Sequence, residues 1–407
     1  MRSNLERSIA RLKVIHDGSI VLNPTENIPI EFKTMANYAF VQGMYVTDQL
    51  REDLETVNPK IIFGGRTRHV QNVRKIQDQW AKLLGAKALS FRLLSGLHMY
   101  MALFMSIGHI GDSVLVLPED AGGHFSVGAI LHRLGYRILY MDWDSHRRCV
   151  DIEKTNAVIK RKNPRFILMD RSEGLNYEDM THLNTSDCDL AVFDASQYLS
   201  NILAGDFKNP FDMGFNAIVA TIHKNFPGPQ KAFVAFKEKS SLWHDLQAKL
   251  RLYVSNTHVY NTYMAGLSLA NMPLIKRYSH SMLKTAKVLA YACEDCGLDN
   301  VEEDHSNQRT HHIWLSFPDK QRAFDAYKKL EWNRILVNYR LLPYDLGYGL
   351  RLGTAWAVLM GLTPKGCRPL AQVIADCVGG KSNLSLRHHI LEIKRSWTPL
   401  VNGLFTE

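Results

Sequence analysis

Apolar and polar positions along the chain alternate in two ways that predict a succession of helices and strands. Before Gly85, an amphipathic helix is predicted from apolar residues three or four positions apart, at Val70, Val73, Ile76, Trp80 and Leu83. The segments that follow contain short apolar runs, which are typical of buried strands. These runs are Ala88–Phe91, Ser113–Leu117, Tyr136–Met141, Phe166–Asp170, Leu190–Asp194, Ala217–Thr221 and Ala232–Phe236.

Helix-length segments separate several of these runs, namely Leu97–Ile107, His124–Leu134 and Ile152–Lys162. Strands that alternate with helices in this way predict an α/β fold with a mainly parallel sheet and helices on both faces. Ligands of such sheets bind beyond the carboxyl ends of the strands. We therefore expect the ligand-binding and catalytic residues in the loops that follow these apolar runs.

Three parts are expected. Residues 1–30 form a segment that packs on the body and opens with a helix over Met1–His16; residues 31–271 form a large domain, and residues 272–407 form a smaller α/β domain. The smaller domain is predicted from a long helical pattern followed by strand-like and helical segments. These segments are Ile313–Phe317, Ala323–Leu330, Arg334–Val337 and Leu350–Leu352.

Composition excludes several classes of protein. Among 407 residues, no run reaches the 18 apolar positions of a membrane span, and the start of the chain lacks the pattern of a secretory signal. We therefore expect a cytoplasmic protein with six reduced cysteines; Cys293 and Cys296 share one apolar helix stripe and predict no metal site. The net charge of +9 is dispersed, which favours attraction of anionic small molecules over a nucleic-acid surface.

The segment from Thr221 to Lys231 carries the strongest chemical signal. It reads Thr-Ile-His-Lys-Asn-Phe-Pro-Gly-Pro-Gln-Lys and lies between two apolar strands. A lone lysine is more often a surface charge. Lys224, however, stands at a strand end before a Pro-Gly-Pro turn, where its amine can hold an aldehyde cofactor as a Schiff base.

Asp194 closes the preceding apolar run, in Phe-Asp-Ala-Ser. Taken singly it could cap a turn. Together with Lys224 at the end of a neighbouring strand, it predicts a site for pyridoxal 5'-phosphate (PLP), whose pyridine nitrogen needs a carboxylate beside it.

Two further segments fit this cofactor. Ser95 and Gly96 follow a strand and begin a helix, where a hydroxyl and backbone N–H groups can bind phosphate. Gly122 and Gly123 precede His124, so that the backbone can approach a flat ligand and the imidazole can stack on it.

These motifs resemble those of the serine hydroxymethyltransferase group of fold-type I PLP enzymes, and the chain is more similar to the L-threonine transaldolase branch of that group. The match runs from Asn23-Pro24-Thr25-Glu26-Asn27 to Arg351-Leu352-Gly353-Thr354. The resemblance implies an aspartate aminotransferase-like fold, with Lys224 as the Schiff-base lysine and Asp194 on the pyridine nitrogen. It implies that Arg351 binds the substrate carboxylate.

The resemblance implies further roles for residues spread along the chain. His124 stacks on the ring and His223 joins the catalytic set, whereas Ser172 and Tyr45 contact the substrate. Tyr45 and the stretch Ser255-Asn256-Thr257-His258 reach the phosphate of a neighbouring subunit, which implies at least a homodimer with shared sites. The other residues implied to bind the cofactor are Ser95, Gly96, Gln197, Thr221, Ser255, Thr257 and His258.

The chain departs from the folate-using enzymes at several positions. Their Tyr-Ala-Glu is Tyr45-Val46-Thr47 here, their Tyr-Tyr pair is Ile62-Phe63, and the histidine three residues after the aspartate is Gln197. Loss of the glutamate removes a general acid. The resemblance therefore implies an enzyme that makes or breaks the Cα–Cβ bond of a β-hydroxy-α-amino acid through a glycyl quinonoid and without folate, with an aldehyde as second substrate.

Three alternatives stay open. The same scaffold supports deamination, elimination or decarboxylation of an amino acid. The chain could also be a serine hydroxymethyltransferase with strict dependence on tetrahydrofolate. A third alternative is a basic binding protein without catalysis, which would bind nucleic acid in a salt-sensitive manner.

Overall fold

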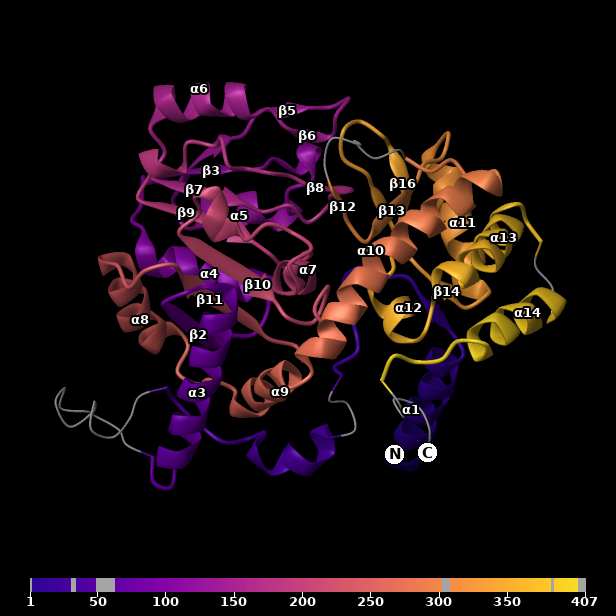
Figure 1. Ribbon diagram of the computed structural model, residues 1–407, viewed down its shortest axis with the longest axis horizontal. Helices are drawn as coiled ribbons and strands as arrows, with labels where there is room; N and C mark the ends of the chain where they lie inside the picture. Colours follow the sequence, from indigo (N-terminus) through magenta and orange to yellow (C-terminus); the bar gives the residue numbers. More distant parts are fainter. Residues whose placement is uncertain (1, 31–33, 49–62, 302–307, 382–383, 402–407) are drawn as a thin grey trace. The chain divides into compact units, whose positions relative to one another are not determined.

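The computed structural model describes residues 2–30, 34–48, 63–301, 308–381 and 384–401 (Figure 1). Ile62, one of the departures noted above, lies outside these ranges. The chain divides into two compact units. One contains residues 27–276, and the other combines the residues up to 26 with those from 277 onward.

A seven-stranded sheet forms the centre of the unit of residues 27–276. Its order is β2 (Ala88–Leu93), β11 (Ala232–Phe236), β10 (Ala217–Thr221), β9 (Leu190–Asp194), β7 (Phe166–Met169), β3 (Ser113–Val116) and β4 (Arg137–Tyr140). Within this sheet only β11 runs antiparallel to its neighbours. The predicted α/β fold with a mainly parallel sheet is confirmed, because every predicted run of this region forms a strand.

Helices cover both faces of the sheet (Figure 1). The helices α4 (Gly96–Ile107), α5 (Phe125–Arg133) and α8 (Ser241–Tyr253) bury their apolar residues against alternate strand residues in one core cluster. On α3 (Thr67–Leu84), the buried Trp80 packs its ring on Phe91 and Phe233. The remaining elements of this unit are α6 (Ile152–Lys162), α7 (Leu199–Ala204), α9 (Val259–Leu269), β5 (Trp143–Asp144), β6 (Cys149–Val150) and β8 (Asn176–Tyr177).

The end of α3 corrects one prediction. Gly85 ends the helix as expected, with a φ of +75°. Leu83 is nevertheless 44% exposed, whereas Leu84 is buried. The helical period of 3.6 residues brings Leu84, four positions after Trp80, onto the core face instead of Leu83.

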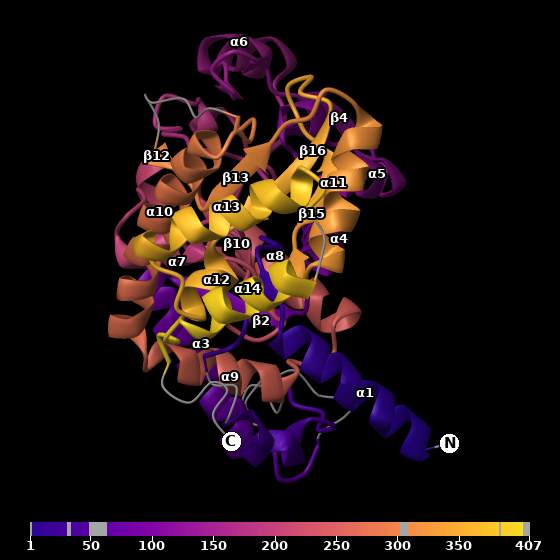
Figure 2. The same ribbon diagram turned by 90° about the vertical axis from the view of Figure 1, so that its right-hand side faces the viewer.

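The unit that contains the carboxyl end is built on a three-stranded antiparallel sheet, β13 (His312–Leu315), β16 (Tyr348–Gly353) and β15 (Asn338–Leu341). Figure 2 shows α13 (Cys367–Val378) and α14 (Leu384–Arg395) in yellow on this unit. Their apolar residues share one core cluster with those of the sheet. The other elements are α10 (Met272–Asp295), which also contributes to the first unit, α11 (Lys320–Trp332), α12 (Ala355–Leu359), β12 (Gln308–Arg309) and β14 (Ile335–Leu336).

The amino-terminal segment joins this second unit. Strand β1 (Ile20–Val21) pairs in parallel with β14, and Lys394 donates hydrogen bonds to the carbonyls of Asp17 and Ser19. The helix α1 (Arg2–Asp17) forms as predicted, but its apolar residues Leu5, Ile9 and Leu12 are more than half exposed. Within the described residues, the hydrogen bonds from Lys394 therefore hold the carboxyl end of α1 on this unit.

All six cysteines are free, and Cys293 is buried on α10. Among the described residues, no group of acidic, histidine and cysteine side chains has the arrangement of a metal site. No helix within the described ranges has both the length and the apolar character that a membrane span requires.

Candidate active site

Lys224 lies in the loop 222–231 that joins β10 to β11, beyond the carboxyl end of β10. The loop backbone is fixed on several sides: the side chain of Asn27 donates to the Lys224 carbonyl at 3.0 Å, and the Asn225 side chain accepts from the Ser200 N–H at 2.7 Å. Gly228 is required for close packing, because a Cβ there would lie 2.6 Å from the Ile222 carbonyl oxygen. The half-buried Lys224 amine therefore extends from a rigid support.

Asp194 is the last residue of β9, the strand next to β10. Its carboxylate is buried, and Oδ1 accepts from the Ser196 N–H at 2.7 Å. Oδ2 accepts from the hydroxyl of Tyr100 on α4. The pairing of β9 with β10 places Asp194 opposite Val219, so Asp194 and Lys224 come from neighbouring strands at one edge of the sheet.

A second carboxyl group, Asp170, stands beside Asp194. Strand β7 pairs with β9 in parallel, with Met169 opposite Phe193, so the next residues, Asp170 and Asp194, are neighbours. Burial raises the pKa of Asp170 to about 7, the charge of Asp194 adds to this effect, and Lys224 opposes it. We call Asp170 and Asp194 the carboxyl pair.

Asp170 and Tyr100 were not predicted as site residues. Asp170 appeared only as the end of a strand-like run, although it carries the same signal as Asp194: an acid that closes a buried strand of a parallel sheet. No comparable signal marks Tyr100, which lies on the apolar face of a helix and is 2% exposed.

His124 and Ser172 lie next to the carboxyl pair. The His124 N–H donates to Asp170 Oδ2 at 3.2 Å, and the Ser172 hydroxyl contacts Asp170 Oδ1 at 3.4 Å. The His124 ring caps α5 by accepting from the Ser126 N–H at 3.1 Å. The predicted stacking of His124 on the cofactor and the predicted contact of Ser172 with substrate stay predictions.

Ser95 and Gly96 form the start of α4, as predicted. Ser95 is the N-cap residue, and its hydroxyl accepts from the His98 N–H at 3.4 Å. A Cβ at Gly96 would lie 3.6 Å from Cγ2 of Thr221, so this loop adjoins the end of β10. The Thr221 hydroxyl is buried and has no hydrogen-bond partner among the described residues, so it is available to a ligand.

Basic groups gather near this helix start. Lys231 is fully buried, and its Nζ donates to the Thr257 carbonyl at 2.7 Å. Burial lowers the pKa of Lys231 well below its ordinary value, and Arg92 adds to the effect. The pKa of His258 falls to about 4 through burial, Lys231 and His98. A bound anion would favour the charged forms of both groups and would raise these pKa values, so the two side chains suit an anionic ligand. The sequence had not indicated a role for Lys231.

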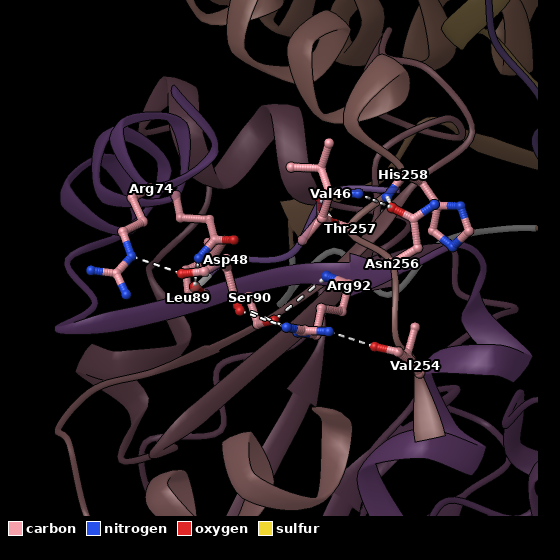
Figure 3. A network of polar contacts seen from close by, with 11 residues as sticks. Val46, Asp48, Arg74, Leu89, Ser90, Arg92, Val254, Asn256, Thr257 and His258 are labelled. Carbon is pink, nitrogen blue, oxygen red and sulfur yellow. Dashed lines mark hydrogen bonds and ion pairs between the residues drawn. The ribbon is translucent and has the colours of Figure 1, made fainter. Parts of the chain in front are cut away.

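The segment that follows Tyr45 lies beside the stretch 255–258, and Figure 3 shows Val46 next to Asn256 and Thr257. The Tyr45 hydroxyl lies 2.8 Å from the Ser255 hydroxyl, and the Thr257 N–H donates to the Val46 carbonyl at 2.8 Å. The buried ion pair of Asp48 and Arg92, at 2.6 Å, supports both segments, because Arg92 also donates to the Val254 carbonyl at 2.6 Å (Figure 3). Contact of these residues with a second subunit stays a prediction.

The remaining predicted residues lie in different surroundings. His223 accepts from the Lys231 N–H at 3.4 Å, and burial followed by the charge of Lys224 lowers its pKa to about 4. Gln197 is buried in the same unit. Arg351 lies on β16 of the other unit, where it donates to Asn338 Oδ1 at 2.8 Å, so its part in substrate binding stays a prediction.

The residues of the unit 27–276 fit PLP. The amine of Lys224 would suit the aldehyde group, and the buried carboxylate of Asp194 would suit the pyridine nitrogen. The start of α4, the unpartnered Thr221 hydroxyl and the basic groups around Lys231 suit a phosphate.

Several known proteins are similar to this chain over most of its length. The family model described as serine hydroxymethyltransferase matches residues 61–374. The serine hydroxymethyltransferase of Pyrobaculum arsenaticum is 25% identical over 349 residues, covering 83% of this chain and 81% of that protein. The enzyme of the same name from Archaeoglobus fulgidus is 26% identical over 329 residues, covering 77% and 74%.

A solved structure also matches. The crystal structure of L-threonine transaldolase from Pseudomonas fluorescens in internal aldimine state superposes with a TM-score of 0.87 at 21% identity, covering 98% of this chain and 92% of that one. The fold and the site together define a fold-type I PLP-dependent transferase. The chain belongs to the serine hydroxymethyltransferase family, and it is a PLP-dependent enzyme that acts on hydroxy amino acids.

Proposed function

We propose that the protein makes or breaks the Cα–Cβ bond of a β-hydroxy-α-amino acid such as L-threonine, without folate. The observation that carries the proposal is Thr47, which stands where the folate-using enzymes have a glutamate, while Lys224 and Asp194 are retained. Threonine has no acidic proton to give in the physiological range. The structural likeness to an L-threonine transaldolase supports the same assignment.

Each residue then has a distinct task. The Lys224 amine holds the cofactor, Asp194 pairs with its pyridine nitrogen, and Ser95, Gly96 and Thr221 hold its phosphate. When bound, PLP withdraws electrons from the α-carbon of the amino acid. The guanidinium of Arg351 binds the substrate carboxylate, a task that suits its fork of donors.

Proton transfer at the substrate hydroxyl is assigned to His124 or to water. His223 is neutral near pH 7, because its pKa is lowered to about 4, so it can accept a proton but has none to donate from a charged form. His223 therefore acts as an acceptor or as a support for the Lys224 loop. Tyr45 and Ser172 are proposed to contact the substrate.

The test is a product assay with the purified, PLP-loaded protein. L-threonine is expected to release acetaldehyde in the absence of folate, and an added aromatic aldehyde is expected to appear in a new β-hydroxy-α-amino acid. The substitution Lys224→Ala should abolish both this turnover and the visible band of covalently held cofactor. Normal turnover in Lys224→Ala would contradict the assignment of the lysine.

The alternatives give different products in the same assay. Strict dependence of serine cleavage on tetrahydrofolate would identify a serine hydroxymethyltransferase. Release of ammonia or carbon dioxide, with no aldehyde from threonine, would identify a deaminase, lyase or decarboxylase.

We also propose a homodimer or larger homo-oligomer whose sites are shared between subunits. Support comes from exposed apolar side chains on Phe40, Tyr45 and Phe63, of which Phe63 lies beside Tyr45 with ring centroids 5.4 Å apart, and on α1. Light scattering measures the mass in solution. If sites are shared, mixing inactive Lys224→Ala with an inactive Tyr45→Ala variant should restore part of the activity; a monomer, or a mixture without any activity, would contradict the proposal.

A cytoplasmic location is proposed for this enzyme. The six free cysteines, with Cys293 and Cys367 buried, are compatible with a reducing compartment. Cell fractionation with an antibody against the protein tests this location.

A further inference from the structure

The hydroxyl of Tyr100 lies between two carboxyl groups. It donates to Asp194 Oδ2, and it also interacts with the Asp170 carboxyl, which lies beside Asp194 at the end of the neighbouring strand β7. All three side chains are buried, with exposed fractions of 2% for Tyr100 and Asp170 and 7% for Asp194. Water therefore has little access to this group of oxygens.

A phenol has one proton to donate, and an ionised carboxylate can only accept. If Asp170 and Asp194 were both ionised, Tyr100 could satisfy only one of them, and the other would face the lone pairs of the phenol oxygen. A single additional proton removes this conflict, because a protonated Asp170 can donate to the Tyr100 oxygen while Tyr100 donates to Asp194. The phenol itself keeps its proton, since burial and the two carboxyl groups raise the pKa of Tyr100 well above its usual value.

The other bonds favour Asp170 as the member that holds the proton. Asp194 Oδ1 accepts from the Ser196 N–H at 2.7 Å and Oδ2 accepts from Tyr100, so both oxygens of Asp194 are stabilised as a carboxylate. Asp170 receives the longer bonds from the His124 N–H at 3.2 Å and from Ser172 at 3.4 Å.

The charged and titratable groups around Asp170 are few. They are Asp194 on β9, Tyr100 on α4, His124 before α5 and Lys224 after β10. The neighbouring Arg171 is neutralised by its ion pair with Glu178. Among these described groups, Lys224 favours ionisation of Asp170 by its charge, and the nearby Asp194 opposes it.

We propose that Asp170 and Asp194 share one proton through Tyr100, so that the pair carries a single negative charge, held on Asp194. Asp170 is then a positioning residue: it gives Asp194 its orientation and charge without itself contacting the cofactor. This inference rests on the proposed role of Asp194 beside PLP. The protonation of the carboxyl pair is a property of the protein alone, so it can be measured without the cofactor.

The first measurement is infrared spectroscopy of the full chain, purified free of PLP. A carbonyl band of a buried carboxylic acid is expected at pH 6, and it should weaken as the pH is raised to 9. The band should be absent from Asp170→Asn, shifted in Tyr100→Phe because its hydrogen-bond acceptor is lost, and unchanged in the control Asp189→Asn, an exposed carboxylate of the same unit. Identical spectra of the wild type and Asp170→Asn at pH 6 would overturn the proposal, as would an unshifted band in Tyr100→Phe.

The second measurement compares unfolding of the two proteins across pH. The unfolded Asp170 ionises near pH 4, about the value of a free aspartate. Because the folded pair keeps its proton, the unfolding constant of the wild type relative to Asp170→Asn should rise by about tenfold per pH unit above that value, until the folded pair also ionises. A ratio that stays constant from pH 4 to 7 would refute the shared proton. Neither measurement uses substrate, so a failed threonine assay and a failed proton assay are independent results.

Discussion

The buried ion pair of Asp48 and Arg92 is expected to dominate the stability of the segments that carry Tyr45 and Ser255. The side chains are only 7% and 1% exposed, and Arg92 Nη2 lies 2.6 Å from Asp48 Oδ1. Burial alone would raise the pKa of Asp48, but the charge and hydrogen bonds of Arg92, together with the charge of Arg251 and a backbone hydrogen bond, outweigh it and the pKa is lowered. The carboxylate is therefore ionised at neutral pH, and it is the counter-ion of a guanidinium that has almost no contact with water.

The substitution Asp48→Ala leaves this guanidinium without a counter-ion. Removing one partner of a buried pair costs about 3–5 kcal/mol, because the remaining charge stays desolvated. For a unit of this size, that loss lowers the unfolding temperature by roughly 10 °C. Differential scanning calorimetry of the wild type and the variant measures the difference.

The matched control is Asp179→Ala in the same unit. Asp179 pairs with Lys208 at 3.1 Å, but the two side chains are 59% and 40% exposed. Exposed pairs contribute about 0–1 kcal/mol, so the unfolding temperature should change by no more than about 3 °C. Replacing both members of the buried pair, in Asp48→Leu with Arg92→Met, should cost less than Asp48→Ala. Equal shifts for Asp48→Ala and Asp179→Ala would refute the reasoning.

Three further predictions concern packing, backbone geometry and pH. Trp80→Ala should lower the free energy of unfolding by about 3–5 kcal/mol in urea titrations, because the side chain is fully buried; a loss below 1 kcal/mol would contradict its central packing. Gly85→Ala should lower the free energy of unfolding by about 1–2 kcal/mol, and Gly122→Ala should lower it by more. Both glycines have a positive φ, but a Cβ at Gly122 would lie 2.2 Å from the Glu173 carbonyl oxygen, whereas a Cβ at Gly85 would have nothing within 4 Å. Burial lowers the pKa of His311 to about 3, below its unfolded value, so its contribution to stability is present above about pH 6.5 and is lost as the pH falls. Between pH 6.5 and 5, the free energy of unfolding should fall by roughly 1.5 kcal/mol, and this fall should be smaller in His311→Gln.

The sequence predicted the sheet well because buried parallel strands consist of continuous apolar runs. Each run from Ala88 to Phe236 forms a strand, and β9, β10 and β11 have the predicted bounds. Lys224 and Asp194 could be predicted to lie at the same edge of the sheet for the same reason, since Asp194 closes one such run and Lys224 follows the end of the next. The apolar runs do not reveal the order of the strands in the sheet. They therefore do not show which strand ends are neighbours.

Two features of the site could not be predicted for this reason. Asp170 becomes meaningful only when β7 lies next to β9, and Tyr100 becomes a site residue only because α4 packs with its apolar face toward the end of β9. The prediction also chose the wrong buried residue at the end of α3, because Leu83 and Leu84 are adjacent and both apolar. The sequence reveals the type of each element more readily than the contacts it makes.

The single reversed strand of the sheet affects how Lys224 can move. Because β11 returns directly beside β10, with Thr221 opposite Ala232, the connecting loop is anchored at both ends by one continuous ladder of hydrogen bonds. The main chain at Lys224 cannot swing as a hinged lid would. Travel of the amine then comes from rotation about the four carbons of its own side chain, so the reach of Lys224 is set by the torsion angles of that side chain.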